Sequence, residues 1–283
     1  KITVKIGELP DTADMFALMQ FRDADNVAQT TLILETTGIL TARTGDFAGA
    51  VIATTSEPVI TAGSWHNVEC RIEISEGAGS IEVRVDGVTV INAPGITQDT
   101  TLAETSQVTL MEFGLANPNI GDSFLADVVA WDTTGTTTND FIGDQRVFTR
   151  FVSQDTAVAD WLPNEVATTL FSRMNQATPD GDTTYARGDN TLDVMELEVD
   201  PVPDGVSSIS FVQMTSMLRK TDAGGCSFVQ SMVSGSYFAD GAEHPLTTDY
   251  THYHDIIEVD PNTGAPFARE DLNAALLRIE RTV

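Results

Sequence analysis

Residues 60–95 constrain the fold of this chain more than any other stretch. From 66 to 74 apolar side chains occupy every second position, which is the period of a β-strand with one buried face. Residues 81–85 repeat the pattern after the glycine-rich stretch 76–79. Asp86-Gly87 is a strong hairpin signal, and a third apolar run follows it. The stretch therefore predicts three antiparallel strands joined by two tight turns.

Short alternating or β-branched runs, separated by Gly, Asp and Asn, continue on both sides of this stretch and predict a β-sandwich with no helix of ordinary length. Strands are expected at 15–22, 27–35, 39–43, 49–54, 107–113, 123–132, 143–151, 192–199, 206–218, 227–233 and 250–259. Helical spacing is limited to 157–174 and to 271–280, where Leu272, Ala275, Leu276 and Ile279 would form one stripe.

The turn Thr178-Pro179-Asp180-Gly181-Asp182 is the best candidate for a domain boundary. We expect a larger β domain over residues 1–178 and a smaller C-terminal β domain over 179–283 that ends in a short helix. The later strands form either a second sandwich or a completion of the first. Because the chain begins at Lys1 without a methionine, an upstream stretch is expected.

Several segments resemble known structural proteins. Gly63-Ser64-Trp65-His66, with the strand after it and Val85-Asp86-Gly87, resembles the core hairpin of laminin-G-like and concanavalin A-like jelly rolls. Phe124–Asp132 and Asn139–Val147 are similar to structural proteins of tailed-bacteriophage virions, as are Gly181–Tyr185 and Asp260–Phe267.

This resemblance implies an all-β, antiparallel jelly-roll sandwich and a non-enzymatic component of a phage virion. Such a protein would be exposed on the particle as a tail fibre, a tail spike or a capsid decoration protein, and would serve assembly and attachment to the host surface. The partners implied are other virion proteins, further copies of the chain, with trimers common, and a host-surface glycan.

The charge balance excludes some partners. The chain has 42 acidic and 15 basic residues, a net charge of -27. Contacts to a nucleic-acid backbone need clustered Lys and Arg, so nucleic acid is not expected as a partner. No apolar run approaches the roughly 20 residues of a membrane span, so membrane insertion is not expected either. The acids predict a solvated surface or, alternatively, several divalent cation sites.

His252 and His254 are the strongest metal candidates, because residues two apart on a strand share a face. Asp240, Glu243 or His244 from the preceding loop would be a third ligand. The alternative is an ordinary strand near a sheet edge with partly exposed imidazoles, and we favour that interpretation because no spacing determines a further ligand.

Asp180, Asp182, Asp189 and Asp193 surround a Gly-containing loop of the kind that binds Ca²⁺ through carboxylates and carbonyls. Their spacing does not match the calcium loop of helix-loop-helix sites, so a solvated acidic loop is the favoured interpretation. No other cofactor is expected.

Two alternative functions would use the same sandwich. A carbohydrate-binding module would present an exposed aromatic side chain, Trp131 or Tyr185, over a groove. A polysaccharide hydrolase or lyase would use Glu196 and Glu198, which alternate on one strand like paired glycosidase carboxylates. We favour an exposed acidic edge for this pair. Cys70 and Cys226 are expected as free buried thiols, with a disulfide between them as the alternative.

Overall fold

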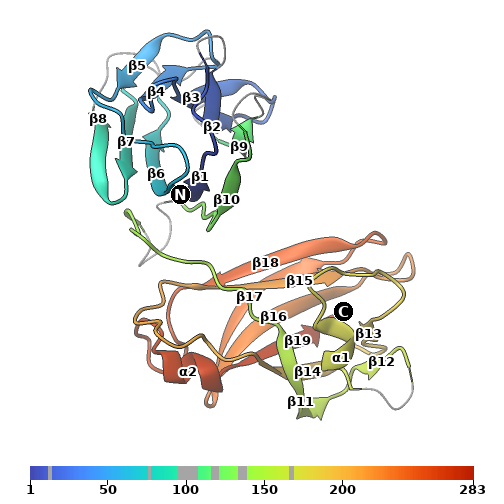
Figure 1. Cartoon of the computed structure of the whole chain (residues 1–283). Helices are drawn as coiled ribbons and strands as arrows, with labels where there is room; N and C mark the ends of the chain where they lie inside the picture. Colours follow the sequence, from blue (N-terminus) through green and yellow to red (C-terminus); the bar gives the residue numbers. More distant parts are fainter. Residues whose placement is uncertain (12–14, 76–77, 95–107, 116–120, 133–138, 166–168) are drawn as a thin grey trace. The chain divides into compact units, whose positions relative to one another are not determined.

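The computed structural model describes residues 1–11, 15–75, 78–94, 108–115, 121–132, 139–165 and 169–283. Strands make up 45% and helices 4% of the structure, which confirms the all-β class. The chain divides into two compact units (Figure 1). Unit 1 is Lys1–Trp131 with Asp140–Val147, and unit 2 is Asp132–Asn139 with Phe148–Val283.

Unit 1 contains two five-stranded antiparallel sheets. Sheet A has the order β10 (Phe124–Ala126), β1 (Ile2–Lys5), β6 (Trp65–Glu73), β7 (Ser80–Val85) and β8 (Val88–Ala93). Sheet B has the order β5 (Val51–Thr54), β4 (Leu40–Thr44), β3 (Ala28–Leu34), β2 (Phe16–Arg22) and β9 (Leu110–Leu115).

The three strands expected in residues 60–95 are β6, β7 and β8, and their antiparallel pairing is confirmed. Between β7 and β8 both central residues of the turn have positive φ, +52° at Asp86 and +79° at Gly87. Positive φ at both positions is the geometry of a type I′ turn, whose twist suits a two-residue hairpin. The local sequence therefore determined this part of the fold.

A single apolar cluster forms the core of unit 1 and takes side chains from both sheets. Ile2, Val4 and Val83 of sheet A are fully buried, as are Leu32 and Leu40 of sheet B. Alternation explains this, because every second residue of β1 and β7 points into the cluster and the others point away. Two antiparallel sheets that share one core are compatible with a β-sandwich.

Unit 2 is built on the five-stranded antiparallel sheet C and on two two-stranded pairs. Sheet C has the order β11 (Val152–Ala159), β14 (Val194–Val199), β19 (Leu276–Arg281), β16 (Ser227–Ser234) and β17 (Tyr237–Pro245). The pairs are β15 (Val212–Leu218) with β18 (Thr251–Ile257), and β12 (Leu162–Pro163) with β13 (Ala186–Arg187). Two apolar clusters join sheet C to the β15–β18 pair.

Both expected helices are much shorter than predicted. Only α1 (Phe171–Met174) is helical in 157–174, because β11 and β12 take the first part; residues 166–168 lie outside the described residues. The second helix, α2 (Arg269–Ala274), stops where β19 begins. Leu276 and Ile279 pair with β14 and β16 in the middle of sheet C. Pairing on both edges of β19 outweighs the helical spacing of its residues.

Three further expectations differ from the structure. Residues 143–151 form no strand, and β17 lies where a loop was expected. The acidic turn at 178–182 lies within unit 2, and the units divide near residue 148 rather than at 178/179. Asp182 of that turn accepts hydrogen bonds from Arg219 and Tyr250, which tie the turn to later parts of the same unit. In the described residues no helix qualifies as a membrane span.

Candidate functional site

The outer face of sheet A carries an ion network made by neighbouring strands. Glu69 and Arg71 of β6 stand directly opposite Arg84 and Glu82 of β7. One oxygen of Glu82 accepts hydrogen bonds from Arg84 (3.0 and 3.1 Å) and its other oxygen accepts one from Arg71 (2.6 Å). Cross-strand pairs of opposite charge stabilise a sheet and hold both guanidinium groups in place. The alternating sequence predicted these residues on one face.

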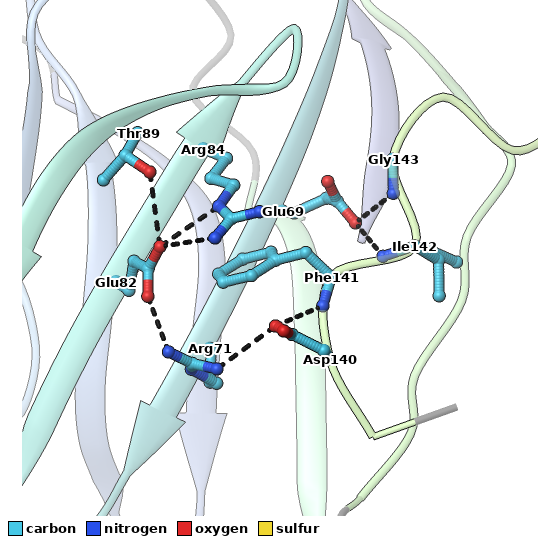
Figure 2. A network of polar contacts seen from close by, with 9 residues as sticks. All are labelled: Glu69, Arg71, Glu82, Arg84, Thr89, Asp140, Phe141, Ile142 and Gly143. Atoms are coloured by element: carbon cyan, nitrogen blue, oxygen red, sulfur yellow. Dashed lines mark hydrogen bonds and ion pairs between the residues drawn. The ribbon is translucent and has the colours of Figure 1, made fainter. Parts of the chain in front are cut away.

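Residues 140–147, which we call the strap, lie across this face (Figure 2). Glu69 is only 1% exposed, and its Oε1 accepts hydrogen bonds from the N–H groups of Ile142 (2.9 Å) and Gly143 (3.0 Å). Two successive N–H groups that converge on one oxygen form an anion-binding turn, helped here by a φ of +72° at Gly143. Asn67 Nδ2 also donates to the Gly143 carbonyl (3.0 Å). The strap is thus held by its backbone.

The first residues of the strap add side-chain contacts. The ring of Phe141 lies under the guanidinium groups of Arg84 and Arg71, 3.8 and 5.1 Å from its centroid (Figure 2). Cations so close to an aromatic face are attracted to it. Asp140 Oδ1 is 3.2 Å from Arg71, but this ion pair is solvent-exposed and contributes little. The arginines held by Glu82 therefore serve as the platform for Phe141.

The last residues of the strap contact the ends of β1 and β10. Lys1 Nζ donates to the carbonyl of Gln145, and the N–H of Val147 donates to Asp127 Oδ1 (2.9 Å). Burial lowers the pKa of the Lys1 side chain, although the nearby Asp127, Glu69 and Asp144 act in the opposite direction. Contacts to the rest of unit 1 therefore extend over the strap from Asp140 to Val147.

An exposed aromatic pair lies further along the same face. Trp65 of β6 and Phe124 of β10 are each 51% exposed, and their ring centroids are 6.4 Å apart. Lys5 stands between them in register. Sequence reasoning placed Phe124 in a buried strand and gave Trp65 no functional role. For Trp65 the available signal was the polar residues that share its face of β6, Asn67 and Glu69. Trp131 and Tyr185, the aromatics named from the sequence, are half-buried.

The metal candidates of unit 2 come only partly together. His252 and His254 share a face of β18, with their rings stacked 6.3 Å apart, as predicted. Their expected third ligands lie on β17 and bond elsewhere: Asp240 with Ser231, Glu243 with Ser227 and Thr282, and His244 with Asp255. Within the ranges that the structure describes, no group of three or more His, Cys, Asp or Glu side chains could hold a metal ion.

The acidic loop is tied by its own hydrogen bonds. Asp180 accepts from the N–H (3.0 Å) and the hydroxyl (2.8 Å) of Thr184. Hydrogen bonds from Tyr250 and Arg219 lower the pKa of Asp182. The other two carboxylates have local partners too, Asp189 with Arg187 and Asp193 with Asn190. Each of the four carboxylates therefore has a hydrogen-bond or ion-pair partner within unit 2.

Glu196 and Glu198 share one face of β14 but differ in environment. Glu196 is held at 2.9 Å from Arg278 on the neighbouring β19, whereas Glu198 is exposed. Both cysteines are free, as expected, but each is half-buried instead of buried. Burial raises the pKa of the Cys70 thiol to about 12, so it is not a reactive group at neutral pH.

A second polar network lies inside unit 2. Asp255 of β18 accepts hydrogen bonds from Gln230 Nε2 (2.7 Å) and the Ala242 N–H (2.8 Å), and lies 2.9 Å from His244 Nε2. Burial alone would raise the pKa of Asp255, but these hydrogen bonds outweigh it and hold the pKa below its usual value. A Cβ on Gly241 would lie 2.2 Å from this carboxylate, so only glycine fits there.

The His244–Asp255 pair resembles half of a catalytic triad, but its surroundings are structural. The His244 ring packs against Phe228 and Tyr253, with centroids 5.4 and 5.2 Å away. Gln230 extends the network to Ser216 of β15 (2.8 Å). The network therefore joins sheet C to the β15–β18 pair.

Comparison with known proteins does not add to this geometry. No protein-family model matches the chain, and a search of curated proteins finds no significant match. The function must be inferred from the residues themselves.

Proposed function

We propose that this chain is a non-enzymatic structural component of a tailed-phage virion, exposed as a tail fibre, a spike or a capsid decoration protein. One observation supports this most directly. The two longest segments that resemble virion proteins, 124–132 and 139–147, are separate in sequence, and their described residues meet on sheet A. The N–H of Val147 donates to Asp127, and Lys1 contacts both Val129 and Gln145. Two of the four segments that carry the resemblance thus belong to one structural feature.

The physical character of the surface agrees with that role. The net charge of -27 disfavours contact with free DNA and keeps copies apart unless a specific contact overcomes the repulsion. Two β units with extensive antiparallel pairing suit a protein that must stay folded outside a cell. The proposal includes a jelly-roll connection in unit 1, self-association, and contact with other virion proteins.

The proposal is tested on particles purified by density gradient from a culture that produces the chain. Peptide mass spectrometry should find the chain at a constant ratio to the major capsid protein, and immunogold labelling should mark the capsid or the tail. An abundant soluble protein of the same culture is the control for carry-over. If the chain stays in the soluble fraction with that control, the virion assignment is wrong.

Glycan binding is a second candidate, favoured by the exposed Trp65–Phe124 pair. Two exposed aromatic side chains in contact form an apolar patch that a partner can cover. Lys5 between the two rings supplies a hydrogen-bond donor. A sugar stacked on one ring and bonded by Lys5 would fit host-surface attachment by an exposed virion protein.

A glycan array tests this candidate. Trp65→Ala should abolish any binding of the intact chain, and the half-buried Tyr185→Ala should not affect it. Loss of binding in Tyr185→Ala alone would move the site to unit 2. Binding that survives Trp65→Ala and Phe124→Ala together would remove the pair from consideration.

A further inference from the structure

The outward face of the β15–β18 pair carries side chains that neither proposed function uses. Every second residue of β18 is buried, and His252 and His254 lie between the buried positions, on the solvent side. On β15 Met214 and Ser216 are buried, so Met217 belongs to the opposite face of that strand. The two imidazoles and the Met217 thioether are therefore on one face of the pair.

The strand register places the thioether beside the imidazoles. Met217 stands directly opposite His252, and Thr215 stands directly opposite His254. Residues opposite each other in an antiparallel pair have Cβ atoms roughly 4.5–5.5 Å apart, so their side chains can share a ligand. In the described residues, the apolar clusters of unit 2 take other side chains of β15 and leave Met217 out. The core therefore makes no use of its sulfur atom.

The two rings are held differently. They stack with centroids 6.3 Å apart and planes 7° apart. His254 Nδ1 lies 3.0 Å from Thr215 Oγ1 and 3.2 Å from Gln213 Nε2, so the hydroxyl or the turned amide can accept the Nδ1 hydrogen. This leaves His254 Nε2 for a metal, as in most ligating histidines. Among the described residues nothing hydrogen-bonds to His252, and its exposed ring can turn toward a shared ion.

The donor atoms select the kind of ion. Two neutral imidazoles and one thioether carry no charge and include a soft sulfur atom. Soft sulfur ligands with imidazole suit Cu(I), whereas Ca²⁺ and Mg²⁺ need oxygen ligands, and Zn²⁺ is bound by Cys, His and carboxylates. Arg219, two positions after Met217, is 2.7 Å from Asp182, which balances its charge. The net charge of -27 attracts cations to the protein.

We infer that His252, His254 and Met217 bind one Cu(I) ion on the outward face of the β15–β18 pair. The third ligand comes from β15 rather than from β17, where sequence reasoning looked for it. A thioether also lies outside the His, Cys, Asp and Glu groups that, within the described residues, offer no metal site by themselves. This inference goes beyond the proposed function, and neither depends on the other.

Competition with the Cu(I) chelator bicinchoninate, under nitrogen with ascorbate as reductant, measures the affinity. Every chain carries Cys226→Ser, because an accessible thiol would compete for the ion. The Cys70 thiol is common to all chains and so cannot cause a difference between them. His252→Ala and Met217→Leu should each weaken Cu(I) binding roughly tenfold or more. Thr215→Val, which removes the acceptor next to His254 Nδ1, should weaken it roughly tenfold.

Two matched controls should bind Cu(I) as the Cys226→Ser chain does. Ile256→Ala changes an exposed residue of the same strand, and Met15→Leu removes an exposed thioether of unit 1. X-ray absorption of the copper-loaded chain should show a sulfur neighbour that Met217→Leu loses and Met15→Leu keeps. With Zn²⁺ in place of Cu(I), Met217→Leu should have no effect, because a thioether is not a zinc ligand.

The result that overturns the inference is equal Cu(I) affinity in Met217→Leu and Met15→Leu, since the thioether would then bind no ion. Equal affinity in His252→Ala and Ile256→Ala would overturn it as well. Neither result would change the outcome expected for the purified particles.

Discussion

Both units contain a carboxylate that accepts more than one hydrogen bond, but the two carboxylates lie in different places. Glu69 is on the outer face of sheet A, under the strap. Asp255 is inside unit 2, where Gln230 and His244 reach it from sheet C. One network attaches a segment to a finished sheet, and the other holds two layers of one core together.

The difference shows that position decides what a polar network can do. A network inside a core must be satisfied at all times, since each unpaired group there is costly, and so it specifies one packing. A network on a sheet face can exchange protein donors for water when the segment leaves. Asp255 therefore suits a permanent role in folding, and Glu69 suits reversible attachment.

The largest expected effect is in unit 2. Asp255→Ala leaves three donors without their acceptor and should lower the free energy of unfolding of unit 2 by roughly 3 kcal/mol. The free energy of unfolding of unit 2 is measured by urea unfolding, with hydrogen exchange of the β16 and β18 amides as the readout. The matched control is Asp249→Ala, an exposed carboxylate of the same unit. An Asp255→Ala protein as stable as that control would show that the network does not hold the layers together.

A smaller effect is expected from Glu69→Ala. Removal of the acceptor should cost the docked strap about 1–3 kcal/mol and release the strap without unfolding unit 1. Amide exchange of Ile142 and Gly143 should then become fast, while exchange of Val83 stays slow. Glu69→Gln keeps an acceptor oxygen and should restore much of the protection. If the Ile142 amide exchanges as slowly in Glu69→Ala as in the unchanged protein, the Glu69 network is as permanent as the Asp255 network.

Phe141→Leu should weaken the strap by about 1 kcal/mol, because leucine keeps the bulk but not the aromatic face under Arg84. Trypsin cleavage after the exposed Arg146 reports the released strap and should accelerate about fivefold, the factor that this free energy corresponds to. Phe124→Leu, an aromatic of the same sheet that contacts Trp65, is the control. Equal acceleration in both variants would remove the special role of the arginine platform.

The smallest expected effect is a loss of stability of unit 2 at acid pH, which is absent near neutral pH. The pKa of Asp255 is lower in the folded state than its ordinary value of 3.8. Its contribution to stability is therefore fully present above that value and is lost as the pH falls through the lower folded pKa. Unit 2 should lose stability only below about pH 4, and Asp255→Asn should flatten that acid slope. If the free energy of unfolding of Asp255→Asn depends on acid pH as that of the unchanged protein does, other carboxylates cause the loss of stability.

Much of unit 1 could be predicted from local sequence. The hairpins of β6, β7 and β8 follow from alternation and from Asp86-Gly87, because those signals act between residues a few positions apart. The strands β2, β3, β4 and β5 were predicted for the same reason. Alternation even placed Glu69 and Arg71 on one outer face.

Elsewhere the neighbours in space mattered more than the neighbours in sequence. Leu276 and Ile279 have helical spacing, but β14 and β16 flank them and make them a strand. The β17 segment contains Gly241 and Pro245 and looked like a loop, yet it pairs with β16, and a Cβ at Gly241 would meet the Asp255 carboxylate. No pattern within either segment contains this information.

The sequence by itself determined which residues of this protein alternate into strands and which side chains face away from the core, because a period of two is a property of consecutive residues. Only the tertiary structure decided what those outward side chains meet. Glu69 and Phe141 are 72 positions apart, and they share a site because the strap lies against the outer face of sheet A. Such long-range contacts depend on the whole packing of the chain, and for that reason the strap could not be found from the residues that form it.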